Sequence, residues 1–184
     1  MTLKEIRIHG RGGQGAVTSS QILAITAFFD GKYCQAFPSF GVERRGAPVE
    51  AFTRISDKPI LVRQHVYEPD YVLVLDPTLI ECVDVTKGLK KNGILIINSD
   101  RKPEEFKLNT KAKIKTIDIT RVALEIIGKP FVNVAALGAF AAITGEITLN
   151  SIYKAIDQEF AEKPKVGELN KKTAEKLFNI AKGA

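Results

Sequence analysis

The sequence predicts a three-layer α/β/α domain built on a mostly parallel sheet that includes an antiparallel strand pair. Two continuous apolar runs, residues 71–75 and 93–98, are typical of strands that are buried on both faces. Segments with a helical spacing of apolar residues alternate with these strands. A glycine-rich turn at residues 10–15 joins an apolar strand to an apolar helix, as in a strand–helix–strand unit.

Length and composition describe one globular domain spanning residues 1–184. The chain has 184 residues, of which 45% are hydrophobic and 26% are charged. Its start lacks the apolar stretch of a signal peptide, and apolar stretches such as residues 132–144 are too short to span a bilayer. We therefore expect a cytoplasmic protein with no membrane partner.

The first elements in the chain are expected to form one edge of the sheet. Apolar residues at positions 3, 6 and 8 predict the first strand, and those between 16 and 28 predict the helix after it. Two extended segments follow, at residues 33–37 and 48–55. Because the connection between them is short for a crossover helix, we expect them to pair antiparallel.

The remaining elements are expected to alternate and then become helical. A helix over residues 79–89 should connect the two buried strands, and a weaker strand is expected at 114–117. Together these elements predict a Rossmann-like arrangement. Glycine and proline breakers then separate four further helices, at residues 120–127, 133–144, 151–160 and 166–181.

The glycine-rich turn is the first candidate binding site. Its glycines let the backbone approach a ligand closely, and the helix after it directs free N–H groups and a positive dipole end at the turn, which suits a phosphate or pyrophosphate. No acidic residue ends the next strand, as a ribose-binding NAD site requires, and no Gly-Lys-Ser/Thr closes a Walker loop. An empty tight turn is the alternative interpretation. The turn consists of Gly10, Arg11, Gly12, Gly13, Gln14 and Gly15.

A second candidate segment lies between the two extended segments of the antiparallel pair. Two adjacent arginines can bind a phosphate or carboxylate through paired hydrogen bonds, and a neighbouring glutamate can orient one of them. The alternative is a solvated hairpin tip with an internal ion pair. Apolar residues beside the charges favour a contact surface. The segment consists of Phe40, Gly41, Val42, Glu43, Arg44, Arg45 and Gly46.

Polar residues also follow the two central strands. Asp76-Pro77 and Asn98-Ser99-Asp100 lie where ligands bind in open α/β sheets, so they are expected to border the same crevice as the glycine turn. Turns with local side-chain capping explain them equally well. Asn133 stands at the start of a helix rich in small residues, and we interpret it as the N-terminal cap of that helix.

Other residue types argue against independent catalysis. The two cysteines, Cys34 and Cys82, and the two histidines, His9 and His65, have no metal-binding spacing, so we expect no metal in this chain. No serine or cysteine nucleophile has a recognisable setting. The net charge of +6 is spread among acidic residues without interleaved aromatics, so no nucleic-acid-binding module is visible. A ligand-holding subunit fits these properties better than a stand-alone enzyme.

Several motifs, spread over nearly the whole chain, resemble those of one protein family. They begin with residues 9–17, around the glycine turn, and continue with Gln35-Ala36-Phe37-Pro38 and residues 41–49. Further matches occur at residues 51–55, 58–60, 68–70, 75–77, 133 and 137–139. These motifs resemble the gamma subunits of pyruvate:ferredoxin oxidoreductase (pyruvate synthase), in the 2-oxoacid:ferredoxin oxidoreductase family.

The resemblance implies a subunit of a complex that oxidatively decarboxylates pyruvate with coenzyme A to acetyl-CoA and CO2 and reduces ferredoxin. Thiamine diphosphate, Mg and [4Fe-4S] clusters would belong to the partner alpha, beta and delta subunits. The gamma subunit would help to bind coenzyme A, here at the glycine turn with Arg11 and Gln14 assisting. Residues 43–45 would face the catalytic subunits or line the approach of coenzyme A.

Two alternatives remain within this resemblance. The complex can act on a branched-chain or another 2-oxoacid, because related complexes have similar gamma subunits. The chain can also be a structural subunit that binds no ligand. Two further hypotheses have less support. An independent dinucleotide-binding oxidoreductase would need an acidic residue after the second strand, and a basic nucleic-acid-binding protein would need aromatic residues among its basic ones.

Overall fold

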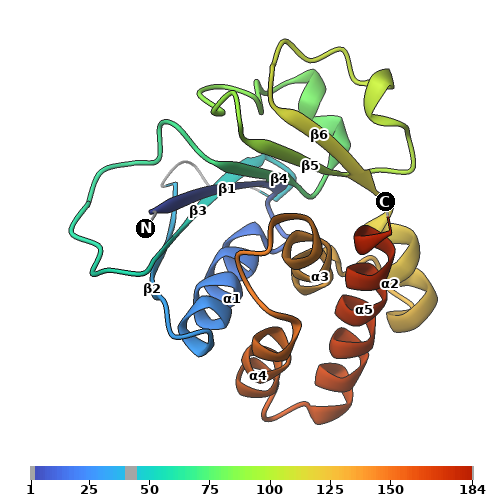
Figure 1. Cartoon of the computed structure of the whole chain (residues 1–184). Coiled ribbons are helices and arrows are strands. Elements are labelled where there is room, and N and C mark those ends of the chain that lie inside the picture. Colours follow the sequence, from blue (N-terminus) through green and yellow to red (C-terminus); the bar gives the residue numbers. More distant parts are fainter. Residues whose placement is uncertain (1–2, 40–44, 184) are drawn as a thin grey trace.

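The computed structural model describes residues 3–39 and 45–183. Within these residues, six strands form one sheet in the order β2-β3-β1-β4-β5-β6 (Figure 1). The strands are β1 (Lys4–Arg11), β2 (Tyr33–Pro38), β3 (Pro48–Ser56), β4 (Tyr71–Val74), β5 (Ile94–Asn98) and β6 (Lys113–Ile117). The α-helices are α1 (Ala16–Phe29), α2 (Ile119–Ile127), α3 (Val132–Thr144), α4 (Leu149–Glu159) and α5 (Pro164–Lys182).

The sheet confirms the expected α/β class, with a mostly parallel sheet and an antiparallel strand pair. Strands β1, β4, β5 and β6 are parallel neighbours. The expected antiparallel pair is β2 with β3, in which Tyr33 lies opposite Ser56. Strand β3 is also antiparallel to β1, with Arg11 opposite Pro48. This second antiparallel contact brings the start of β3 beside the glycine turn that follows β1.

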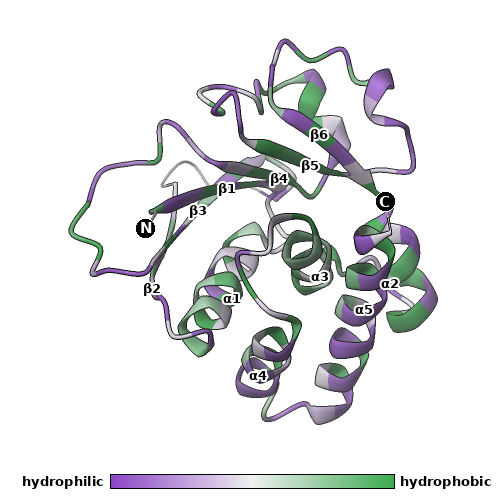
Figure 2. Ribbon diagram, in the orientation of Figure 1, coloured by the Kyte–Doolittle hydropathy of each residue, from purple (hydrophilic) through white to green (hydrophobic). Residues whose placement is uncertain are grey.

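The helices cover one face of the sheet and enclose the main core with it (Figure 1). Ile8, Leu73 and Ile96 of the sheet pack in one buried cluster with Leu23 of α1 and Phe140 of α3. Figure 2 shows α3 hydrophobic along most of its length, whereas α5 has alternating hydrophilic and hydrophobic surfaces. The four helices predicted for the C-terminal part of the chain correspond to α2, α3, α4 and α5. None of the described helices combines the length and apolar character needed to cross a bilayer.

The opposite face is covered by loops and two short 3₁₀-helices, η1 (Pro77–Glu81) and η2 (Pro103–Glu105). Among the described residues no α-helix packs on this face, so the second helical layer of the expected three-layer arrangement is wrong. The expected helix over residues 79–89 is wrong, because after η1 the chain continues in turns. The buried guanidinium of Arg7 donates to the carbonyl oxygens of Val85 (3.0 Å) and Lys87 (2.7 Å). Gly88 has a positive φ of 71°, which ends any helical path there. Hydrogen bonding to the sheet thus takes precedence over local helix formation.

A buried arginine fixes the long loop between β3 and β4 to this outer face. Arg54 is only 1% exposed and forms a 2.8 Å ion pair with Glu5. Its guanidinium also donates to the carbonyl oxygen of Gln64 at 2.6 Å and lies 5.1 Å from the centre of the Phe37 ring. The two faces of the sheet are therefore held differently. Apolar packing dominates the helical face, whereas the outer face combines a smaller apolar cluster around Val72 and Ile97 with the polar contacts of Arg7 and Arg54.

Candidate functional site

The glycine turn connects β1 directly to α1 and leaves the start of the helix without a side-chain cap. Gly13 and Gly15 have positive φ angles of 97° and 78°. Gly15 is the N-cap residue, and its carbonyl accepts the first helical hydrogen bond from the Ser19 N–H at 2.8 Å. The free N–H groups of the first helical turn point toward the glycine turn, and the positive end of the helix dipole lies there too. This geometry suits an anion.

Gly15 also allows a close contact with α3. A Cβ atom at position 15 would lie 2.8 Å from the side-chain nitrogen of Asn133. The Ser19 hydroxyl donates to the Asn133 carbonyl oxygen at 3.0 Å. Asn133 lies inside α3, whose N-cap is Phe131, so the interpretation of Asn133 as an N-terminal cap is wrong. Its side chain instead packs over the glycine turn.

Arg11 and Gln14 are both bound by Asp76, which follows β4. The Arg11 Nε lies 3.2 Å from Asp76 Oδ2, and Arg11 Nη2 donates to the Thr78 hydroxyl at 2.7 Å. Gln14 donates through Nε2 to Asp76 Oδ2 at 2.8 Å and accepts the Arg11 backbone N–H at 2.7 Å. Both side chains therefore shape the turn, and Asp76 already compensates the charge of Arg11.

The environment of Asp76 keeps its carboxylate ionised. Burial favours the neutral acid, but hydrogen bonds from Thr78 and Gln14 and the charge of Arg11 outweigh it, so the pKa of Asp76 is lowered. Asp76 also caps η1 by accepting the Thr78 N–H at 3.0 Å. The capping interpretation of Asp76 is thus correct.

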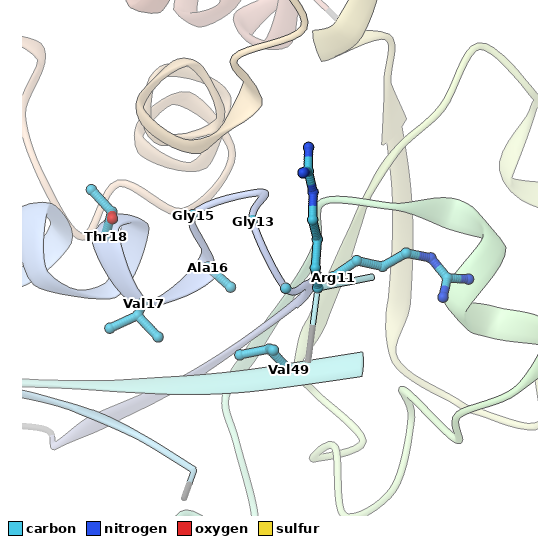
Figure 3. A pocket seen from close by; sticks show the side chains of 9 residues that line it. Arg11, Gly13, Gly15, Ala16, Val17, Thr18 and Val49 are labelled. Carbon is cyan, nitrogen blue, oxygen red and sulfur yellow. The ribbon is translucent and has the colours of Figure 1, made fainter. Parts of the chain in front are cut away.

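A pocket of about 640 Å³, which we call the loop pocket, opens beside the turn (Figure 3). Strand β3 begins next to the turn, so Arg45 and Val49 reach this pocket from a distant part of the sequence. The Gly46 N–H donates to the Gly12 carbonyl at 3.0 Å and fixes this approach. The pocket is lined by Arg11, Gly12, Gly13, Gly15, Ala16, Val17, Thr18, Arg45 and Val49.

The structure thus brings the glycine turn into contact with the described end of the second candidate segment, residues 45–46. Arg45 and Gly46 of the second segment meet the glycine turn, since the Arg11 Nη1 also donates to the Gly46 carbonyl at 3.1 Å. Phe40, Gly41, Val42, Glu43 and Arg44 lie outside the described residues. No pattern in the sequence identifies Val17, Thr18 or Val49 as lining residues, because small apolar or hydroxyl side chains also suit an ordinary helix or strand.

A second pocket, which we call the edge pocket, lies on the other side of the turn and has a volume of about 710 Å³. It shares Gly13, Gly15 and Thr18 with the loop pocket. Asp76, Pro77 and Asn98 line it, so the expected crevice at the carboxyl ends of the strands is confirmed for them, whereas the positions 99 and 100 are not among its lining residues.

Asn98 is fully engaged by hydrogen bonds at the edge of this crevice. Its side-chain oxygen accepts the N–H groups of Ile119 (2.9 Å) and Thr120 (3.1 Å) at the start of α2. Its side-chain nitrogen donates to the Leu75 carbonyl and the Thr120 hydroxyl, each at 2.8 Å. The interpretation of Asn98 as a local cap of its own turn is therefore wrong, because its partners are 21 to 23 positions away in sequence, and its amide is committed to the fold.

The remaining titratable candidates lie away from both pockets. His9 is 1% exposed, and burial together with the positive charge of Arg7 lowers its pKa to about 3, so the ring is neutral at physiological pH. Among the described residues, no three His, Cys, Asp or Glu side chains are grouped to hold a metal ion. The two cysteines of the sequence do not supply the four thiolates of a [4Fe-4S] cluster.

Fold and site together define an α/β protein with a glycine turn between two pockets. Residues 5–180 match the family model for pyruvate ferredoxin/flavodoxin oxidoreductase, and the chain belongs to this family. It is 61% identical to the pyruvate synthase subunit PorC of Methanosarcina barkeri, over 84% of this chain and 85% of the relative. The resemblance to gamma subunits found in the sequence is confirmed.

Two further relatives extend the comparison. The "Pyruvate/ketoisovalerate oxidoreductases common subunit gamma" of Thermococcus kodakarensis is 56% identical over 95% of both chains. The crystal structure of the pyruvate oxidoreductase subunit PORC from Thermotoga maritima superimposes with a TM-score of 0.86 at 38% identity, covering 97% of both chains. The chain is therefore a gamma-type subunit of the oxidoreductase family, and its fold is that of PorC.

Proposed function

We propose that this chain is the gamma subunit of a cytoplasmic complex that converts pyruvate and coenzyme A to acetyl-CoA and CO2 and reduces ferredoxin. Its partners would be alpha, beta and delta subunits, which would hold thiamine diphosphate, Mg and the [4Fe-4S] clusters. Residues 1–184 would form a single gamma domain. The family match over residues 5–180 and the relatives named for pyruvate synthase support this proposal.

Within the complex, we infer that this chain binds the phosphates of coenzyme A at the glycine turn. The observation that carries the inference is the uncapped start of α1, which opens into a pocket that Arg45 also lines. Backbone N–H groups and an arginine are the donors that bind phosphate oxygens most effectively in proteins. Val17 and Val49 add an apolar wall for the uncharged part of the ligand.

The two arginines of the loop pocket have different roles in this proposal. Arg11 is paired with Asp76 and Thr78, so it positions the turn. Arg45 is an exposed side chain in the turn just before β3 and would bind the phosphates directly. The chain would thus orient coenzyme A for carbon chemistry that the thiamine cofactor performs on a partner subunit.

The test compares Arg45→Ala with Arg101→Ala in the assembled complex. Arg101 is a 53% exposed arginine that lines neither pocket, so it is a matched control for loss of one positive charge. We expect Arg45→Ala to raise the KM for coenzyme A about tenfold, because a charge-assisted hydrogen bond contributes about 1.5 kcal/mol or more. The KM for pyruvate should stay unchanged. Equal coenzyme A KM values in both variants would refute the role of Arg45.

A second candidate is a gamma subunit shared between two complexes. The Thermococcus kodakarensis relative is named a common subunit of pyruvate and ketoisovalerate oxidoreductases. Affinity purification of the tagged chain from its own cells, followed by assays with pyruvate and with 2-ketoisovalerate, separates the two cases. Activity with both oxoacids in distinct complexes would support a shared subunit, and activity with pyruvate alone would exclude it.

A further inference from the structure

The loop between β3 and β4, residues 57–70, follows a path that side chains of the sheet fix through its backbone. Arg54 donates to the carbonyl oxygen of Gln64 at 2.6 Å, and the Gln35 amide donates to that of Ile60 at 3.3 Å. Figure 1 shows this loop extending away from the sheet beside β2. Loops longer than about 12 residues without a helix or strand of their own are uncommon and usually functional. We call this segment the outer loop.

The outer loop places large apolar side chains in solvent. Leu61 is 87% exposed and Tyr67 is 67% exposed, whereas Val66 is buried. Figure 2 shows a hydrophobic stretch within this otherwise largely hydrophilic loop. Exposure of such side chains to water is unfavourable, and because the backbone of the loop is fixed, they do not fold back onto the sheet. Their outward position indicates a binding surface.

Aromatic contacts and strand β2 connect these side chains into one surface, which we call the outer patch. The centre of the His65 ring lies 6.5 Å from those of both Phe37 and Tyr67. Tyr33 is 51% exposed and lies on the same face of β2 as Phe37, because side chains an even number of positions apart share a face. The outer patch consists of Tyr33, Leu61, His65 and Tyr67.

The outer patch is large enough to form the centre of a protein–protein interface. A tyrosine has about 200 Å² of surface to bury, so the exposed fractions of Tyr33 and Tyr67 leave on the order of 200 Å² uncovered before Leu61 is added. A standard interface takes about 800 Å² from each partner and has an apolar centre with a polar rim. The polar side chains of the outer loop provide that rim.

Two cations on either side of Leu61 define the chemistry of the partner. Lys58 and Arg63 are exposed, and neither side chain forms an ion pair with the residues that the structure describes. In a two-fold dimer centred on Leu61, Lys58 of one copy would face Arg63 of the other, which is repulsive. A different chain that carries carboxylates around an apolar hollow complements this surface better.

We propose that the outer patch docks another subunit of the oxidoreductase complex, with Leu61 and Tyr67 in an apolar hollow and carboxylates beside Lys58 and Arg63. The chain belongs to a family of subunits, so such a partner is present in every assembled complex. The outer loop follows Ser56, at the far end of β3 from the glycine turn, and the 9 residues of β3 span about 26 Å. This contact is therefore separate from both pockets.

The test compares Leu61→Ala with Leu124→Ala in the assembled complex. Leu124 is a 48% exposed leucine of α2, so it is a matched control for loss of one exposed apolar side chain. Native mass spectrometry over a dilution series measures how much of this chain has dissociated. We expect Leu61→Ala to raise the dissociation constant about tenfold, equivalent to about 1.4 kcal/mol, and Leu124→Ala to leave it unchanged. Complexes that stay assembled should keep the same KM for coenzyme A.

A second measurement identifies what covers the patch. A photoreactive phenylalanine analogue in place of Leu61 should form cross-links to another subunit of the complex, which peptide mass spectrometry identifies. Cross-links between two copies of this chain, or none, would overturn the inference. Equal dissociation constants for Leu61→Ala and Leu124→Ala would also overturn it. Failure of the proposed coenzyme A site is detected by Arg45→Ala and does not change these results, so the two proposals are tested separately.

Discussion

The two sides of the glycine turn differ in whether their polar groups already have hydrogen-bond partners within the protein. On one side, Arg11 and Gln14 form a closed network with Asp76 and Thr78. On the other side, the uncapped start of α1 opens into the loop pocket beside Arg45. An arginine inside a glycine-rich motif is therefore not automatically a ligand-binding residue. Here both arginines line the loop pocket, but the arginine of the motif is already paired with Asp76, whereas the distant Arg45 is exposed.

Energetics explain this division. To bind a phosphate, Arg11 would have to leave a carboxylate 3.2 Å away and a hydroxyl 2.7 Å away. Leaving the partly buried Asp76 without its cation would incur a desolvation cost that the new contact must offset. Arg45 is an exposed side chain, so its contact with a phosphate carries no comparable structural cost. The comparison predicts that variants on the closed side lose stability, whereas variants on the open side lose affinity.

The largest effect is expected for Gly15→Ala. Alanine at φ 78° is strained, and its methyl group would lie 2.8 Å from the Asn133 side chain. We expect a loss of about 2–4 kcal/mol in the free energy of unfolding, the sum of backbone strain and overpacking. Gly13→Ala is the matched control, because it also has a positive φ but meets no atom within 4 Å. Chemical denaturation measures both, and equal losses would contradict the close contact with Asn133.

Asp76→Ala should have the next largest effect. It removes the acceptor of Arg11, Gln14 and the Thr78 N–H together and leaves partly buried donors unsatisfied. We expect the free energy of unfolding to fall by about 1–3 kcal/mol. Chemical denaturation checks this value against Asp76→Asn, which keeps an acceptor for Thr78. If Asp76→Ala unfolds like the unmodified protein, the closed network does not stabilise the turn.

Arg11→Ala and Arg45→Ala should have opposite signatures. Arg11→Ala should lower the unfolding free energy by about 1 kcal/mol, since it removes an ion pair that is partly exposed. Its effect on the KM for coenzyme A should be smaller than that of Arg45→Ala, which should leave stability unchanged. Thermal unfolding and steady-state kinetics of the same complexes decide between them. A larger KM increase for Arg11→Ala would identify Arg11 as the phosphate ligand.

The smallest effect is a pH dependence that belongs to Asp76. Its pKa is lowered in the folded protein, so the carboxylate stabilises the fold above its unfolded pKa of about 3.9. This stabilisation is lost as the pH falls through the lower folded pKa. The Tm difference between the unmodified protein and Asp76→Asn should therefore be largest near neutral pH and should shrink below about pH 4. A difference that stays constant with pH would contradict this role.

Local patterns in the sequence were enough to predict most of the fold. The apolar runs at residues 71–75 and 93–98 correspond to the buried strands β4 and β5. Gly128 and Gly145 end α2 and α3 at positive φ angles, as the breakers indicated. The short connection after β2 correctly predicted its antiparallel pairing with β3. Each of these features depends on residues that are close together in the sequence.

Features that depend on distant residues could not be predicted. The pairing of β3 with β1, which brings Arg45 to the glycine turn, leaves no local pattern. The same holds for the link between Arg11 and Asp76, which are 65 positions apart in sequence. The helix expected after β4 failed because Arg7, on another strand, binds the carbonyl groups of that segment. Contacts between residues far apart in the sequence thus determine which side chains form the site.

A structure of the assembled complex with coenzyme A bound would test most directly whether this chain binds the phosphates of coenzyme A at the glycine turn. We expect phosphate oxygens about 3 Å from the amide nitrogens at the start of α1 and within reach of Arg45. Coenzyme A phosphates held entirely by partner subunits, with no contact to residues 12–18 or Arg45, would contradict it.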